Sequence, residues 1–239
     1  MAKIMFSLWR PEPQSAEHWR DTLIGLQDLL MALGASEIRL MVVDQDVEKA
    51  SAQRMTASRS PLDGMLSITL EDPEKLRLVL RLLEKHVEKL HAYQVRESVP
   101  CSEKRSARKA QLGIQNAIGK RTPGMCQVAT FKRPPRLSLD EWTHHWREHG
   151  FSAYILQSIF DCRQNIVIAA LTPGAPEIDA IVEEHYPATA IGNPAAFYGA
   201  PGNFELLYER EQATSESVCR FMDFGSLDCI LTSFYQVSA

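Results

Sequence analysis

The chain contains the stretch Trp9-Arg10-Pro11-Glu12-Pro13-Gln14-Ser15-Ala16-Glu17-His18-Trp19. Its counterpart, 123 residues further on, is Lys132-Arg133-Pro134-Pro135-Arg136-Leu137-Ser138-Leu139-Asp140-Glu141-Trp142. In each stretch a proline turn follows an apolar run, and a serine and a tryptophan come next at the same spacing. Serine favours the residue before a helix, and acidic residues favour its first turn. Each stretch therefore predicts a strand, a turn and an amphipathic helix, and the pair indicates an internal repeat.

The elements predicted after these stretches keep the same order in both halves. In the first half they are strands over 38–43 and 63–70, a helix over 73–90 and a strand over 92–98. In the second half they are strands over 166–171 and 179–186, a broken helical region over 188–204 and a strand over 229–237. The order β-α-β-β-α-β, found twice, predicts an α+β fold of two tandem ferredoxin-like repeats.

The repeat divides the chain into three parts. Residues 1–98 form a degenerate first repeat, residues 99–124 a basic linker, and residues 125–239 the second repeat. The linker carries six Lys or Arg residues between 104 and 121 against one acidic residue. No aromatic residues are interleaved with these charges as a nucleic-acid stacking platform requires. We therefore expect a solvated linker with one short helix.

The composition excludes several classes of protein. The 239 residues are 45% hydrophobic and 23% charged, which is ordinary for a folded protein. The net charge of −4 gives no overall attraction to nucleic acid or to an anionic membrane. No apolar run approaches the roughly 18 residues of a membrane helix, and the first residues lack the pattern of a signal peptide. The five cysteines form no close C-x-x-C pair. We expect a cytoplasmic protein without a nucleic-acid or membrane partner.

The second stretch extends into Phe131–His149, which resembles the signature of the EthD family. That signature has a basic strand end, Leu-Ser, an aromatic pair and then a histidine. The later Asp179-Ala180-Ile181-Val182-Glu183 is similar to the family's Asp-Gly-x-Ala-Glu strand. The resemblance covers Met125–Val237 and is only a degraded echo in the first half. It implies a tandem-repeat member of the dimeric α+β barrel superfamily, whose two repeats form the barrel within one chain.

For function, the resemblance implies a range of activities. EthD-like proteins include accessory proteins of ether degradation. Relatives in aromatic polyketide pathways are decarboxylases or dehydratases that use no cofactor, and other barrel relatives are cofactor-free oxygenases. The fold alone does not choose among these reactions.

One stripe of the second-half helix holds large apolar residues and a single histidine: Leu139, Trp142, Trp146, His149 and Ala153. The matching first-half stripe is wholly apolar: Ala16, Trp19, Leu23, Leu26 and Leu30. The repeat aligns Leu26 with His149, so the fold itself does not require an imidazole there. A histidine that titrates near neutrality can transfer protons. We interpret His149 as a general acid or base, with a structurally satisfied buried histidine as the open alternative. His144 and His145 face other directions and are expected to be solvated or structural.

The third strand of each half repeats this contrast with a period of two. The first-half face expected toward the helices is apolar and includes Ile68 and Leu70, and its second-half counterparts are Glu184 and Tyr186. Glu183, which matches the EthD glutamate, falls on the opposite face, toward the barrel interior. A register shift of one residue would exchange the two glutamates, so both remain candidates.

These residues predict a polar pocket in the second half. Its catalytic candidates are His149, Glu184 and Glu183. Its substrate-binding candidates and further wall residues are Trp142, Trp146, Tyr186, Phe197, Tyr198 and Phe204. We expect a cofactor-independent enzyme that acts on an apolar, aromatic or polycyclic molecule by decarboxylation, dehydration or oxygenation. The alternative is a non-catalytic binding or accessory protein of a degradation or biosynthetic pathway. An outer face of either repeat could also form a homodimer.

Other chemistries find less support in the sequence. Glu141, His145 and His149 recur at the spacing i, i+4, i+8, which can present metal ligands along a helix. The motif H-E-x-x-H is absent, however, and we expect no metal. There is no G-x-S-x-G hydrolase elbow. There is also no phosphate-binding glycine loop, so no nucleotide cofactor is expected.

Overall fold

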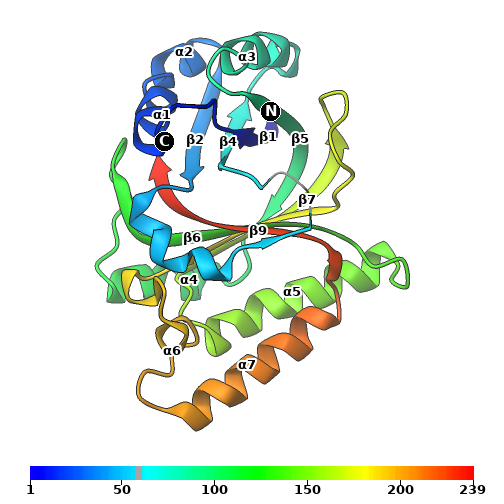
Figure 1. Ribbon diagram of the computed structural model, residues 1–239. Coiled ribbons are helices and arrows are strands. Elements are labelled where there is room, and N and C mark those ends of the chain that lie inside the picture. Colours follow the sequence, from blue (N-terminus) through cyan, green and yellow to red (C-terminus); the bar gives the residue numbers. More distant parts are fainter. Residues whose placement is uncertain (58–60) are drawn as a thin grey trace.

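The computed structural model describes residues 1–57 and 61–239 and contains one continuous sheet that closes into a barrel (Figure 1). Its strands are β1 (Ala2–Trp9), β2 (Ala35–Val42), β3 (Met55–Thr56), β4 (Gly64–Leu70), β5 (Lys89–Ser98), β6 (Arg121–Lys132), β7 (Asp161–Ala170), β8 (Ala180–Tyr186) and β9 (Asp223–Gln236). Eight of them follow the order β2-β4-β1-β5-β7-β8-β6-β9, and β2 pairs with β9 to close the circle. The short β3 also pairs with β9, and all pairings are antiparallel.

The strand order confirms the two tandem ferredoxin-like repeats. The first half runs β2-β4-β1-β5 and the second half runs β7-β8-β6-β9, so each half places its strands in the order second, third, first, fourth. The two four-stranded sheets join where β5 pairs with β7 and where β2 pairs with β9. The barrel is therefore formed within one chain.

The helices lie outside the barrel. They are α1 (Ala16–Ile24), α2 (Gln27–Ala32), α3 (Leu76–Leu83), α4 (Ser102–Gln111), α5 (Leu139–Leu156), α6 (Pro194–Phe197) and α7 (Phe204–Cys219). Short 3-10 helices are η1 (Gln45–Gln53), η2 (Pro73–Lys75) and η3 (Ala188–Ala190). In Figure 1, α1, α2 and α3 cover one side of the barrel, and α5 and α7 cover the opposite side. Within the described residues, no helix is both long and apolar enough to cross a membrane.

The two serines predicted as helix caps do cap helices. Ser15 accepts a hydrogen bond from the backbone of His18, and Ser138 forms a reciprocal capping box with Glu141. The helices then differ in length. In the first half α1 ends before Gly25, whereas α5 continues for 18 residues through the aligned Glu148. Glycine costs about 1 kcal/mol in a helix interior, which favours the break at that position.

Three apolar clusters fill the molecule. One lies between the first-half helices and their sheet and includes Trp19, Leu26 and Ile68. The second lies between α5, α7 and the second-half sheet and includes Trp142 and Trp146. The third fills the barrel interior. The face of β8 that carries Ala180, Val182 and Tyr186 belongs to the second cluster, as the predicted register requires.

Several predicted boundaries were wrong. The first-half helix predicted over 73–90 is only η2 and α3, because β5 begins at Lys89. The broken helical region predicted over 188–204 is confirmed as η3 and α6, but the main helix, α7, begins only at its end and was not predicted. Prolines and glycines between 187 and 202 interrupt that region, and Asn203 then caps α7 by accepting a hydrogen bond from the backbone of Leu206. β9 also begins earlier than predicted, at Asp223.

The basic linker is only partly solvated. It carries the expected short helix, α4, and β6 begins within it at Arg121. Two of its basic side chains, Arg105 and Lys109, pair with Asp161 of β7 at 2.7 and 3.0 Å. These ion pairs attach α4 to the end of the barrel.

Candidate functional site

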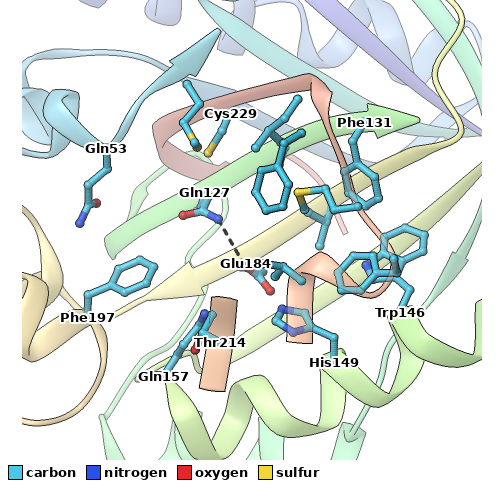
Figure 2. Close-up of a pocket in the computed structure, with 18 of the residues that line it drawn as sticks. Gln53, Gln127, Phe131, Trp146, His149, Gln157, Glu184, Phe197, Thr214 and Cys229 are labelled. Atoms are coloured by element: carbon cyan, nitrogen blue, oxygen red, sulfur yellow. Dashed lines mark hydrogen bonds between the residues drawn. The ribbon is translucent and has the colours of Figure 1, made fainter. Parts of the chain in front are cut away.

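A cavity of about 260 Å³ lies between α5, α7 and the sheet of the second half (Figure 2). Its aromatic walls are Phe131, Trp146, Phe197, Tyr198, Phe221 and Phe224. An apolar cavity of about 150 Å³ can hold benzene, so this one has room for a molecule larger than a single ring. Aromatic walls with a few polar groups are the usual form of a small-molecule site.

His149 reaches the cavity from the inward stripe of α5. Its Nδ1 lies 3.0 Å from the hydroxyl oxygen of Ser217 on α7, and its ring lies 5.2 Å from that of Phe221. Among the described residues, Ser217 is its hydrogen-bond partner, which leaves Nε2 available to a bound molecule. The prediction that His149 titrates near neutrality was wrong. Burial, helped by the charge of Arg220, lowers its pKa to about 4, so the ring is neutral at pH 7.

Glu184 reaches the same cavity from β8, and Figure 2 shows its carboxylate and the ring of His149 turned toward the same space. Burial raises the pKa of Glu184 to about 7, because no cation among the described residues compensates the charge. Gln127 of β6 donates to its Oε2 at 3.4 Å, and the hydroxyl of Tyr186 donates to the same oxygen at 3.3 Å. A carboxyl with a pKa near 7 can both accept and release a proton at neutral pH.

Tyr186 does not line the cavity but contacts two residues that do, Gln157 and Phe197. Its hydroxyl donates to Oε1 of Gln157 at 2.6 Å, and its ring stacks on Phe197 with centroids 4.1 Å apart. Because a hydroxyl carries one proton, Tyr186 cannot donate fully to both Gln157 and Glu184. The shorter contact belongs to Gln157. Glu184 therefore receives only weak hydrogen bonds from its neighbours, and this agrees with its raised pKa.

The other predicted residues fall into two groups. Trp146, Phe197 and Tyr198 line the cavity as predicted. Trp142 and Tyr186 do not line it, and the indole nitrogen of Trp142 instead donates to the carbonyl of Phe221 at 3.0 Å. Phe204 cannot be a wall residue, because it is 86% exposed at the start of α7.

Glu183 points away from the cavity into the barrel interior. Asn165 donates to its Oε1 at 3.1 Å, and Lys3 and Arg39 approach its carboxylate at 3.4 and 3.7 Å. Burial alone would raise the pKa of Glu183, but the nearby cations outweigh that effect and lower it to about 2. A permanently ionised carboxylate on the far side of the sheet cannot share a proton with His149. Glu183 is part of an ion-pair layer that fills one end of the barrel.

Several lining residues were not found from the sequence. Gln127 shares a face of β6 with the apolar Ala129 and Phe131, so the period of two could have exposed it. Gln53 and Met55 come from η1 and β3 of the first half and reach the cavity of the second half. No local sequence pattern predicts that these first-half residues reach the cavity of the second half.

The helical set weighed as metal ligands does not converge. Glu141 is exposed and accepts a hydrogen bond from the backbone of Ser138 at 2.9 Å as part of the helix cap. His149 is buried toward the cavity, whereas His145 lies on another side of α5. The three side chains therefore cannot share one ion.

Comparison with known proteins establishes the fold. The sequence matches no protein-family model and no curated protein. Among solved structures, it is similar to an anthrone oxidase-like protein, with a TM-score of 0.55, 11% identity and coverage of 99% of this chain and 93% of that one. It is also similar to a Lactobacillus acidophilus NCFM protein designated "putative monooxygenase", with a TM-score of 0.52, 9% identity and coverage of 100% and 97%. The full-length likeness shows the dimeric α+β barrel architecture, here formed by a tandem repeat.

Proposed function

We propose that the protein is a cofactor-independent enzyme that removes a proton from an aromatic small molecule bound in the second-half cavity. The observation that carries this proposal is Glu184, a buried carboxyl with a pKa raised to about 7 that faces an aromatic-lined cavity beside His149. Burying a carboxyl without a compensating cation costs stability. Perturbed groups of this kind gather at functional sites because proton transfer requires them.

The catalytic roles depend on the protonation states at neutral pH. Glu184 is about half ionised near pH 7, so its carboxylate can take a proton from a substrate O–H or C–H group. His149 is neutral, and Ser217 orients its ring through Nδ1. Its Nε2 then hydrogen-bonds the substrate oxygen on which charge changes. In this proposal Glu184 carries the proton and His149 positions the substrate. The sequence had instead indicated His149 as the general acid or base.

The stretch Phe131–His149, which resembles the EthD signature, contributes His149 to this site, and the names of the two structural relatives favour the oxygenating form of the proposal. In that form the deprotonated substrate passes electrons to dioxygen, and a ring CH₂ group and O₂ become a C=O group and water. Dehydration can begin with the same proton removal, whereas decarboxylation would release CO₂ and leave a carbanion to which protonated Glu184 would deliver a proton. The site therefore supports proton transfer by Glu184, and the chemistry of the substrate determines its direction and the later steps.

The test compares Glu184→Gln and His149→Leu with the wild-type chain on a panel of polycyclic phenols and ketones under air. We expect Glu184→Gln to lower kcat/KM by roughly 10²–10⁴-fold, the usual contribution of a general acid or base, while ligand affinity changes little. His149→Leu copies the first repeat and should keep the fold while losing turnover. Glu216→Gln, an exposed change on α7, is the matched control.

Two results would change this assignment. Turnover by Glu184→Gln at the wild-type rate would exclude Glu184 as the proton carrier. Saturable binding across the panel with no product from the wild-type chain, and no dependence on pH near 7, would instead support a binding or accessory protein.

A further inference from the structure

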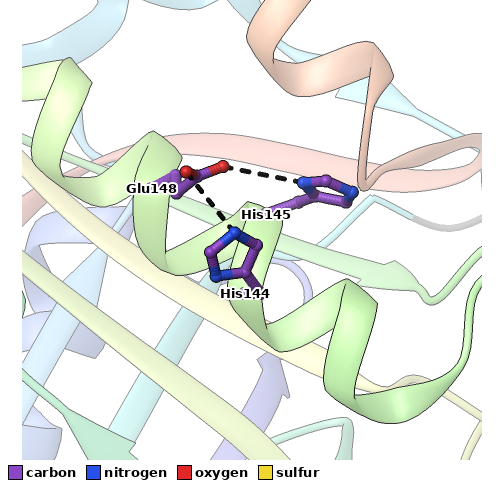
Figure 3. A group of neighbouring side chains, drawn as sticks. All are labelled: His144, His145 and Glu148. Atoms are coloured by element: carbon purple, nitrogen blue, oxygen red, sulfur yellow. Dashed lines mark ion pairs between the residues drawn. The ribbon is translucent and has the colours of Figure 1, made fainter.

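Three potential metal ligands meet on α5, and none of them lines the cavity (Figure 3). They are His144, His145 and Glu148, whose side chains are 67%, 32% and 50% exposed. Figure 3 shows the carboxylate of Glu148 between the two imidazole rings, with one ring nitrogen of each histidine directed at it. The three ligand atoms all lie within 4.8 Å of one another.

The distances fit the coordination of a small cation. Nε2 of His144 lies 3.5 Å from Oε1 of Glu148, and Nδ1 of His145 lies 3.7 Å from Oε2. A tetrahedral zinc ion with ligands at 2.0–2.1 Å has ligand-to-ligand edges of about 3.3–3.4 Å. Rotations of these side chains would bring the three ligand atoms, which now lie within 4.8 Å of one another, to these separations.

A second observation points to a ligand here. Nδ1 of His145 is shielded from solvent and makes no hydrogen bond within the described part of the chain, because the carboxylate of its ion-pair partner, Glu148, is 3.7 Å away. A shielded ring nitrogen without a hydrogen bond is uncommon and calls for an explanation. An ordinary surface pairing of Glu148 with the histidines would contribute only about 0.3–0.5 kcal/mol. An ion bound by the nitrogen would satisfy it directly.

We propose that His144, His145 and Glu148 form a binding site for one divalent late transition-metal ion of the Zn²⁺ type, with water completing the shell. Two imidazoles and a carboxylate are ligands that such ions prefer. The site is specific to the second half, because the aligned first-half residues are Asp21, Thr22 and Gly25. It also bridges one turn of α5 directly before His149. A bound ion would stabilise the helical turn that continues here but breaks at Gly25 in the first half.

The experiment titrates Zn²⁺ into the full chain without an affinity tag, by calorimetry and by thermal unfolding. We expect one equivalent to bind in the micromolar range and to raise Tm, because binding to the folded state alone stabilises it. Even outer-shell partners of a metal are worth roughly 10–100-fold in affinity. The direct-ligand variants His144→Ala and Glu148→Gln should therefore bind at least about tenfold more weakly. His18→Ala, an exposed histidine on α1, should bind like the wild type.

Co²⁺ provides a second readout, because its visible spectrum reports the ligand set. The spectrum should change in both variants while far-UV circular dichroism shows that they remain folded. The proposal is overturned if the wild-type chain binds only millimolar Zn²⁺, or if both variants bind one equivalent with unchanged affinity. The outcome is independent of substrate turnover, so it stands or fails separately from the function proposed for the cavity.

Discussion

The two halves of the barrel share strand order, helix caps and an apolar helix-facing sheet, but one encloses a filled core and the other a cavity. Leu26 and Ile68 of the first half are buried in a continuous apolar cluster. The residues aligned with them, His149 and Glu184, line a cavity of about 260 Å³. Since the same architecture forms with either set, the imidazole and the carboxyl are not needed for folding. Their retention in one half is what a binding or catalytic role would require.

The largest effect is expected when a carboxyl is placed in the first half, at the position aligned with Glu184. Ile68→Glu puts a glutamate into a core where Ile68 is fully buried among the apolar side chains of the first cluster. An unpaired buried charge is expected to cost roughly 3–5 kcal/mol at pH 8. Urea unfolding measures this loss. The reciprocal Glu184→Ile change should be neutral or stabilising at that pH, and a first half that tolerated Ile68→Glu within about 1 kcal/mol would contradict the contrast.

A change of pH tests the difference between the halves because the stability contribution of Glu184 depends on pH. The pKa of Glu184 is raised from 4.5 to about 7, so between these values the folded state holds more protons than the unfolded chain. Its contribution to stability is present below about pH 4.5 and is lost as the pH rises through 7. The shift corresponds to about 3 kcal/mol. Relative to the wild type, Glu184→Gln should therefore gain up to about this amount between pH 4.5 and 8.

The difference between the two proteins is the quantity to measure, by urea unfolding at several pH values. Burial lowers the pKa of both His149 and His185 to about 4, and this favours the folded state as the pH rises from 4 to about 6.5. Subtraction removes these opposing contributions because both proteins contain the histidines. Parallel curves for the wild type and Glu184→Gln would mean that Glu184 ionises normally.

The smallest effect is expected from a change at Tyr186, whose hydroxyl donates a hydrogen bond to Glu184. Tyr186 aligns with the fully buried Leu70, so Tyr186→Phe makes this position apolar as in the first half. The hydrogen bond from Tyr186 lowers the pKa of Glu184, and its removal should raise that pKa further. Loss of the 2.6 Å bond to Gln157 should also cost about 1 kcal/mol. The pH profile of stability or turnover should move to higher pH, whereas Tyr208→Phe, which is 65% exposed on α7, should leave it in place.

Much of the fold was predictable because it depends on repeated local patterns. Ser15 and Ser138 mark helix starts, and the alternation along β8 placed Glu184 and Glu183 on opposite faces but left open which of them faces the pocket. The helix α7 was missed because Phe204, Tyr208 and other exposed apolar side chains blur its helical period. The contribution of Gln53 and Met55 to the cavity arises from the crossing of η1 and β3 into the other half. Such long-range contacts leave no trace in a local sequence pattern.

The candidate site was predictable in identity but not in chemistry. Comparing the repeats found His149 and Glu184, because each is a polar substitution on an otherwise apolar face. Their protonation could not be deduced, since it depends on which charges lie nearby in space. Lys3 and Arg39, both in the first half, keep Glu183 ionised, while Glu184 on the other face has no cation beside it in the part of the chain that the structure describes.

The pairing of β9 with β2 sets an order of events during synthesis. Tyr235 and Val237 belong to the core of the first half, and the backbone of Val237 donates to the carbonyl of Ile38. A ribosome therefore releases most of the second half before the first half receives the last residues of its own core. The core of the first half therefore stays incomplete until a strand about 200 residues further along the chain has been made. Folding repeat by repeat during translation would leave the first half without Tyr235 and Val237 in its core, and the barrel can close only after β9 has been made.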